Sequence, residues 1–318
     1  MINVQDEVVA AEERIRPYVR ETPLEFSFFF SGAANNRTYL KLENVQRTGS
    51  FKLRGAFNKL LALDDGARDR GILTASTGNH GLAVAHALHT LGLCGSICLP
   101  ENASRQKVAM LRHYGVDLLF HGTDGVEAER YARHRSAQEG IVYISPYNDP
   151  HIIGGQGTVA VEVLRQLDAV DCVMASVGGG GLVAGVAGYL KAMRPEVEVI
   201  GCLPQHSQVM YDSIQAGHIV ESTVLPTLSD GTAGGIEAGA ITFDLCRRYV
   251  DDWVLVDEPS IRHALKLVFD QHRLVIEGAA AVTVASFLQI KERLAGKTVA
   301  LILCGGNIDI DTFKTLVC

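Results

Sequence analysis

Residues 71–100 read GILTASTGNHGLAVAHALHTLGLCGSICLP: an apolar run, a helical pattern and a second apolar run. GILTA (71–75) has the length and composition of a buried strand, and residues 81–92 place apolar side chains at helical spacing before a glycine. The next strand is expected at 95–100. A strand that returns through a helix to another strand predicts a parallel sheet, whose ligand-binding loops follow the carboxyl ends of the strands.

The same alternation extends in both directions along the chain. Further strands are expected at 116–120, 141–144, 172–176, 197–203 and 298–304, with helices near 104–114, 124–138, 156–167, 182–193, 258–272 and 278–294. The pattern restarts after Pro150, and segment 221–240, rich in Gly, Ser and Thr, is expected to be a long functional loop. The sequence therefore predicts an α/β protein with two open parallel-sheet domains. The smaller spans 48–148, and the larger combines 1–47 with 149–318.

Composition excludes several classes of protein. The 318 residues are 47% hydrophobic and 20% charged, as in ordinary soluble globular proteins. A net charge of −7 argues against nucleic-acid binding, which requires clustered Lys and Arg. The sequence contains no run of ~18 apolar residues, so no membrane-spanning helix is expected. Residues 1–19 also lack the apolar core of a signal peptide. We therefore expect a cytoplasmic protein with no nucleic-acid or membrane partner.

The cysteines do not form a metal-binding pattern. There are seven of them, an odd number, and they are scattered along the chain. Cys94 and Cys98 have no second pair and no histidine at the spacing of a zinc site. Cys94, Cys98, Cys172 and Cys202 lie in apolar stretches and are expected to be reduced, buried thiols. Cys304 is a separate case, because it directly follows the last predicted strand.

Two of the loops that follow strands have the composition of anion sites. In ASTGNHG (75–81), hydroxyls lie beside the free backbone amides of a helix start, which suits a carboxylate; a simple N-cap is the alternative. In SVGGGGLVAG (176–185), four glycines before a helix let amides surround a phosphate. The second loop is not a Walker motif. It is also a poor dinucleotide motif, because Glu196 and Glu198 flank the start of the next strand and not its end.

The stretch GSFKLRGA (49–56) places Lys52 between glycines, and CGGN (304–307) follows the last strand. Alone, Lys52 is most simply a surface charge and CGGN a turn. One ligand accounts for both, together with the two loops: pyridoxal 5′-phosphate requires a lysine, a phosphate site and partners for its ring oxygen and nitrogen. The pKa of that lysine, normally ~10.4, must be lowered by burial for the amine to react at neutral pH.

The set TGSFKLRGA, STGNHG, GGQGT (154–158), GGGGLVAG and CGGN, in this order, resembles the fold-type II pyridoxal-phosphate enzymes of the serine/threonine dehydratase and serine racemase family. The resemblance covers nearly the whole chain and implies a tryptophan synthase β-like architecture and a homo-oligomer, a dimer. DGTAGGIE (230–237), with VIEGAAA around Glu277, is similar to a branch of threonine dehydratases associated with hydroxyectoine utilisation.

The resemblance implies roles for particular residues. Lys52 binds the cofactor covalently and Phe51 packs beside its ring. The other implied cofactor contacts are Asn79 at the ring hydroxyl, Cys304 at the ring nitrogen, and Gly178, Gly179, Gly180, Gly181 and Leu182 at the phosphate. The substrate carboxylate is assigned to Ser76, Thr77, Gly78 and His80.

Two departures from the family pattern bear on function. The racemases carry a serine as second acid/base where this chain has Thr77, which weakens a racemase assignment. Relatives with a divalent-metal site carry carboxylates where this chain has Leu203 and Val209, with Ser207 at the middle position, so no metal site is expected.

We therefore predict a pyridoxal-phosphate-dependent ammonia-lyase that eliminates water and ammonia from a β-hydroxy amino acid such as L-threonine or L-serine. The neutral thiol of Cys304 favours elimination over long-lived carbanion chemistry. Four alternatives remain: an amino-acid racemase, a dehydratase of a hydroxylated diamino acid, a nicotinamide oxidoreductase and a non-catalytic binding protein.

Overall fold

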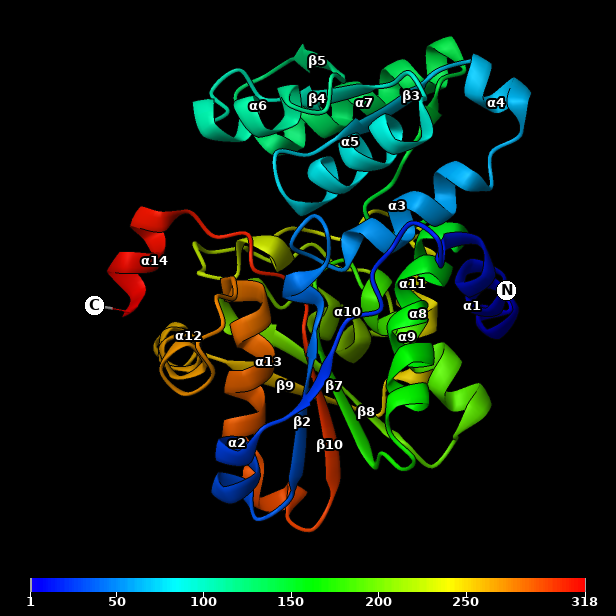
Figure 1. The fold of residues 1–318 in the computed structure, drawn as a ribbon. Coiled ribbons are helices and arrows are strands. Elements are labelled where there is room, and N and C mark those ends of the chain that lie inside the picture. The colour runs from blue at the N-terminus through cyan, green and yellow to red at the C-terminus, as the bar shows by residue number, and fades with distance from the viewer. Residues whose placement is uncertain (1, 318) are drawn as a thin grey trace.

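Two sheets with helices on both faces make up the computed structural model, which describes residues 2–317 (Figure 1). The larger sheet has the order β1-β2-β10-β7-β8-β9, and all its pairs are parallel except β1 with β2. Its strands are β1 (Leu24–Phe26), β2 (Arg37–Leu42), β7 (Cys172–Ser176), β8 (Glu198–Pro204), β9 (Asp252–Val256) and β10 (Thr298–Leu303).

The smaller sheet, in the upper part of Figure 1, has the order β5-β4-β3-β6 and is entirely parallel. Its strands are β3 (Ile72–Ala75), β4 (Ser96–Leu99), β5 (Asp117–Phe120) and β6 (Val142–Tyr143). The α/β class with two parallel sheets is thus confirmed. Each strand expected between 71 and 144 lies within two residues of its predicted bounds, because these short apolar runs are bounded by turns and helices.

The helices around the smaller sheet are α4 (Asp65–Asp69), α5 (Asn79–Leu91), α6 (Arg105–Arg112) and α7 (Gly125–Glu139). Those around the larger sheet are α1 (Val4–Ile15), α2 (Phe28–Ala34), α8 (Pro150–Gln166), α9 (Gly181–Met193), α10 (Val209–Ala216), α11 (Ile241–Tyr249), α12 (Glu258–His272), α13 (Gly278–Gln289) and α14 (Ile310–Val317). Helices α1, α8 and α9 cover one face of the larger sheet, and α2, α12 and α13 the other (Figure 1). No helix within residues 2–317 is long and apolar enough to cross a membrane.

Helix α3 (Lys52–Leu61) lies between the two sheets and packs on both α5 and α8 (Figure 1). Its contact with α8 is backbone to backbone, since a Cβ added at Gly155 would lie 2.6 Å from both the carbonyl oxygen of Arg54 and Cα of Gly55. The sequence predicted no helix here, because its first residue, Lys52, follows Phe51, which offers no capping side chain.

Cys94 is exposed and not buried as predicted, because it lies in the short connection between α5 and β4.

Three further differences from the sequence prediction have local causes. Helix α8 begins at Pro150, six residues earlier than expected, because Asp149 caps it and accepts hydrogen bonds from the backbone N–H groups of His151 (2.8 Å) and Ile152 (3.3 Å). Strands β1 and β9 lie at the two edges of the larger sheet, where burial is partial and the apolar pattern is weak. Segment 221–240 is a loop as predicted, apart from the short 3₁₀ turn Asp230–Thr232.

Candidate active site

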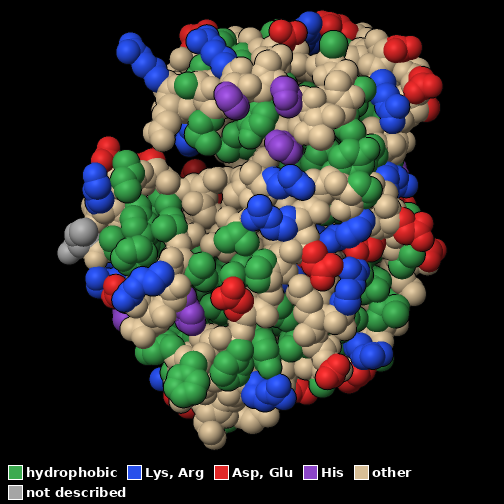
Figure 2. All heavy atoms as spheres, viewed as in Figure 1, with side chains coloured by type: hydrophobic (Ala, Val, Ile, Leu, Met, Phe, Trp, Pro, Cys, Tyr) green, Lys and Arg blue, Asp and Glu red, His purple; other side chains and the backbone are tan. Residues whose placement is uncertain are grey.

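The loops ASTGNHG (75–81), SVGGGG (176–181) and CGGN (304–307) follow the carboxyl ends of β3, β7 and β10, near the region between the sheets, where the surface is hollowed (Figure 2). Lys52 is the first residue of α3. It is held there by a hydrogen bond from the Phe51 N–H to the carbonyl of Cys304 (3.1 Å) and by a bridge between Ser50 and Gly305. The segment between β2 and α3 and the segment after β10 are thereby joined next to the lysine.

The amine of Lys52 points toward the segment that connects the two sheets. Its Nζ donates to the carbonyl of Pro146 (2.8 Å) and lies 5.3 Å from the centroid of the Phe51 ring. Burial lowers the pKa of Lys52 to about 8, while Cys304 and Glu277 act weakly in the opposite direction. The amine is therefore a much better nucleophile and base at neutral pH than an exposed lysine.

Asn79, the first residue of α5, belongs to a polar group that includes Glu277 and Asn307. Its Nδ2 donates to both carboxylate oxygens of Glu277 (2.7 and 3.0 Å), and its Oδ1 accepts from Nδ2 of Asn307 (2.7 Å). The backbone N–H of Asn307 also donates to Glu277 (3.2 Å). Burial raises the pKa of Glu277 to about 7 despite these donors. The orientation of the Asn79 amide is thus fixed on both sides.

Cys304 follows β10 and is buried beside the end of β7. The hydroxyl of Ser176 donates to its Sγ (3.3 Å). Burial raises the pKa of the Cys304 thiol well above its ordinary value, so the thiol is neutral at physiological pH. Because the sulfur already accepts a hydrogen bond, its own proton is free to donate elsewhere.

The glycine loop between β7 and α9 is closely surrounded. A Cβ added at Gly178 would lie 2.9 Å from the carbonyl oxygen of Thr232, and one added at Gly179 would lie 2.5 Å from the Tyr147 ring. Gly180 has φ +86°, a conformation that favours glycine. Gly181 begins α9 and Leu182 is buried behind it. The first N–H groups of this helix lack intrahelical acceptors, so they are available to an anion.

The loop after β3 places Ser76, Thr77 and Gly78, all half-buried, directly before α5. His80 is buried, and its Nε2 contacts the carbonyl of Ile144 (3.0 Å). Burial, reinforced by the charge of Lys52, lowers the pKa of His80 to about 3. A neutral ring that donates through Nε2 leaves Nδ1 as an acceptor, so the His80 group suited to a carboxylate is its backbone N–H.

Glu277, Tyr147 and Ser176 were missed as site residues by the sequence prediction. Glu277 could have been noticed, because it is a lone carboxylate directly before the apolar helix GAAAVTVASF. Tyr147 lies in a connection between elements, and its hydroxyl accepts the Glu237 N–H (2.8 Å) across the molecule. No local pattern marks such a contact.

Comparison with known proteins identifies the family. Residues 15–305 match the model of a protein family that is described as "Pyridoxal-phosphate dependent enzyme". The chain belongs to this family. It is 38% identical over 317 residues to L-threonine ammonia-lyase of Thermotoga maritima, covering 100% of this chain and 78% of that relative.

Solved structures of this pyridoxal-phosphate family agree. The processed form of threonine deaminase isoform 2 from Solanum lycopersicum superposes with a TM-score of 0.94 at 34% identity, covering 98% of this chain and 92% of that one. Maize serine racemase gives a TM-score of 0.92 at 32% identity, with coverages of 98% and 95%. The chain is therefore a pyridoxal-phosphate-dependent enzyme of the dehydratase and racemase type.

The residues present fit this cofactor. The glycine loop offers unobstructed amides for a phosphate, and the buried Thr242 hydroxyl, which has no partner within residues 2–317, lies beside Gly180. Lys52 supplies a buried amine of lowered pKa, and Cys304 a neutral thiol. The phosphate, the aldehyde and the ring nitrogen of the cofactor each have a chemically suitable partner among these residues.

Proposed function

We propose that this enzyme removes water and ammonia from a β-hydroxy amino acid, L-threonine or L-serine, and releases a 2-oxo acid. The observation that carries the proposal is the half-buried Lys52, whose amine donates to the carbonyl of Pro146 at 2.8 Å, lies close to Cys304 and Glu277, and has its pKa lowered to about 8 by desolvation. The similarity to threonine ammonia-lyases and threonine deaminases supports the same reaction.

Pyridoxal phosphate, when bound, provides the electron sink that makes the α-proton of the amino acid acidic. In our proposal Lys52 anchors the cofactor, Phe51 lies beside its ring, and Asn79 and Cys304 contact the ring oxygen and nitrogen. The amides of residues 178–182 hold its phosphate. Glu277 has no direct part in the reaction; it fixes the Asn79 amide through two hydrogen bonds.

Lys52 is the proposed base for the α-proton. An amine with a pKa of about 8 is neutral in about one molecule in ten at pH 7, several hundred times more often than one at 10.5. Amides and hydroxyls of residues 76–80 orient the substrate carboxylate, and Thr77 is the proposed second acid/base. Loss of the α-proton and the β-hydroxyl gives water and an enamine, which tautomerises and hydrolyses to the 2-oxo acid and ammonia.

Racemisation is a second candidate, favoured by the similarity to maize serine racemase. The same α-proton is removed, but its return from the opposite face requires an acid there, and Thr77 offers a bulkier hydroxyl than serine. Incubation of L-serine with the enzyme separates the two, since elimination yields pyruvate and racemisation yields D-serine.

The third proposal concerns the substrate side chain. The resemblance of DGTAGGIE to the hydroxyectoine-associated branch suggests a hydroxylated diamino acid as an alternative to threonine and serine, and 3-hydroxyaspartate completes the set. A panel of these amino acids, assayed for oxo-acid release, would rank them. The cytoplasmic location, the homodimer and the division into residues 48–148 and the remainder stay predictions.

The central test replaces Lys52 with alanine and uses Lys59→Ala as the matched control on the same helix, where Lys59 pairs with Asp149 (2.6 Å). Lys52→Ala should abolish oxo-acid formation and borohydride labelling by the cofactor, whereas Lys59→Ala should retain both. Borohydride labelling of a different lysine in the parent enzyme would refute the assignment.

A further inference from the structure

Arg54 lies two residues after Lys52 on helix α3 and points the opposite way. Successive residues of an α-helix are about 100° apart around its axis, so these two side chains leave the helix about 200° apart. Lys52 reaches the carbonyl of Pro146, while Arg54 is fully buried against α8 and the end of β2. Whatever holds Arg54 therefore determines the direction in which Lys52 points.

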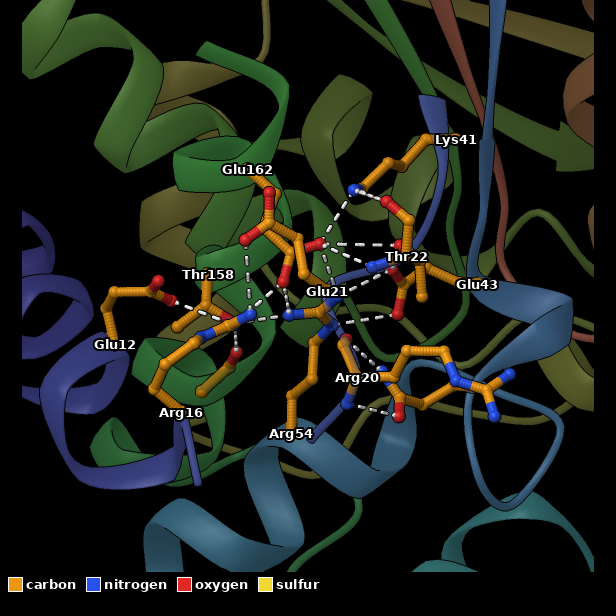
Figure 3. Close-up of polar contacts among 12 residues, drawn as sticks. Glu12, Arg16, Arg20, Glu21, Thr22, Lys41, Glu43, Arg54, Thr158 and Glu162 are labelled. Atoms are coloured by element: carbon orange, nitrogen blue, oxygen red, sulfur yellow. Dashed lines mark hydrogen bonds and ion pairs between the residues drawn. The ribbon is translucent and has the colours of Figure 1, made fainter. Parts of the chain in front are cut away.

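Arg54 is held by five hydrogen bonds, which use all three of its nitrogen atoms (Figure 3). Its guanidinium donates twice to Glu43 (2.8 and 2.8 Å) and twice to Glu162 (2.7 and 2.8 Å). A fifth bond goes to the hydroxyl of Thr158 (3.1 Å). Two paired carboxylates on separate elements fix a planar guanidinium in position and rotation, which a single contact cannot do.

Stability alone is a poor explanation for this cluster. Arg54, Glu43 and Glu162 have fully buried side chains, as does Lys41, which pairs with Glu162 at 2.6 Å. Removing such charges from water is costly, and apolar residues of similar volume often stabilise a protein at least as well. What a buried ion cluster adds is a defined geometry.

We propose that Arg54 is a positioning residue, which acts through Glu43 and Glu162 to fix the rotation of α3 and thereby aims the amine of Lys52. An atom about 6 Å from the helix axis moves ~1 Å when the helix rotates by about 10°. A displacement of that size at a reacting group can cost about 100-fold in rate. The proposal rests on the proposed function of Lys52.

Lys41 provides a control inside the same cluster. It donates to Glu162, to Gln166 (2.9 Å) and to the carbonyl of Thr22 (2.7 Å), and none of these contacts involves α3. Lys41→Met therefore disturbs the buried charges without releasing the helix. Arg54→Lys keeps the charge of Arg54 but cannot span two carboxylates, since an ammonium lacks the planar fork.

The experiment compares these two variants with the parent, all loaded with pyridoxal phosphate. Arg54→Lys should lower kcat about 10- to 100-fold with KM within about threefold. It should also slow covalent capture of pyridoxal phosphate by the apoprotein at least about tenfold, measured by the absorbance of the lysine linkage. Lys41→Met should leave kcat and the capture rate within about threefold of the parent values, even if its melting temperature falls as much as that of Arg54→Lys.

The positioning role would be overturned if kcat and the capture rate fell in both Arg54→Lys and Lys41→Met in proportion to each variant's loss of stability. An unchanged capture rate in Arg54→Lys would also overturn it. If Arg54→Lys does not fold, Glu43→Gln replaces it, because this variant keeps the side-chain shape and weakens one of the two paired contacts; about a tenfold fall in capture rate is expected. Absence of borohydride labelling at Lys52 in the parent would instead refute the proposed function itself.

Discussion

Glu277 should make the stability of the apoprotein depend on pH between about 4.5 and 7. Burial raises its pKa from 4.5 to about 7 in the folded chain. The folded state therefore keeps a proton that the unfolded state gives up. The contribution of Glu277 is most favourable below about pH 4.5 and is lost as the pH rises through about 7.

The size of the effect follows from the two pKa values. The rise in the pKa of Glu277 from 4.5 to about 7 means that the folded protein with ionised Glu277 is less stable by about 3 kcal/mol, at about 1.4 kcal/mol for each pKa unit. For a chain of 318 residues, unfolding entropy of about 2 cal/mol/K per residue converts this to a Glu277-dependent fall of ~5 °C in melting temperature between about pH 5 and pH 8, which the titration of His80 opposes below about pH 6.5.

Glu277→Gln should remove this fall, because glutamine retains an oxygen that accepts from Asn79 but does not ionise. Melting curves of the parent, of Glu277→Gln and of a surface control, Glu292→Gln, recorded between about pH 5 and pH 8, give the answer. The comparison is between variants because other groups titrate as well. His80, whose folded pKa is lowered from 6.5 to about 3, contributes with the opposite sign below about pH 6.5, and Lys52 contributes with the opposite sign above about pH 8. Glu162 contributes only below 4.5, since its folded pKa is lowered to about 2. Identical slopes in the parent and Glu277→Gln would refute the reasoning.

Four more outcomes are expected. Gly180→Asp should expel the cofactor, since a Cβ at this position would lie 2.8 Å from the methyl group of Met210 and the carboxylate would repel the phosphate. Unchanged affinity for pyridoxal phosphate would show that the glycine loop is not part of the site. Cys304→Ser should keep elimination within about tenfold, whereas Cys304→Asp should slow oxo-acid release and increase transamination, because a carboxylate favours a protonated ring nitrogen. Prolonged chelation should leave activity unaltered, since Leu203 and Val209 stand where carboxylates would be required; restoration by Mg²⁺ of a lost activity would contradict this. Capture of pyridoxal phosphate by the apoprotein should accelerate about tenfold per pH unit until about pH 8, where Lys52 becomes neutral, and a rate that continues to rise toward pH 10 would show that the amine is not perturbed.

The sequence was informative about the site because parallel sheets gather the carboxyl ends of their strands. ASTGNHG, the glycine loop and Cys304 each follow a predicted strand. The structure places Cys304 and His80 close to Lys52, and it packs the glycine loop against Tyr147, the neighbour of the residue whose carbonyl accepts from the Lys52 amine. Periodicity sufficed for this, since the three strands that precede these loops, β3, β7 and β10, are buried at every residue.

The partners that complete the site could not be predicted in the same way. The contact of Asn79 with Glu277 joins residues 198 positions apart, and that of Tyr147 with Glu237 joins residues 90 apart. Such pairs depend on how two sheets are placed relative to each other, which no local pattern encodes. The start of α3 was missed for a different reason: tertiary contacts of Phe51 and Arg54 replace the usual capping side chain.

The place of β10 in the larger sheet has a consequence for the order in which the protein can be made. This strand lies between β2 and β7, yet it is the last strand to leave the ribosome. The strands of the smaller sheet, β3 to β6, come from one continuous stretch and need nothing downstream to pair, so they can fold during synthesis.

Until β10 arrives, by contrast, β2 and β7 expose unpaired edges at the centre of the sheet, and Phe51 has no carbonyl of Cys304 to hold it. A nascent chain can therefore pair the strands of the smaller sheet while the larger sheet still lacks one of its central strands. The backbone contact that holds Phe51, next to Lys52, forms only after Cys304 has been added, so the surroundings of this lysine are completed after every other strand has been made.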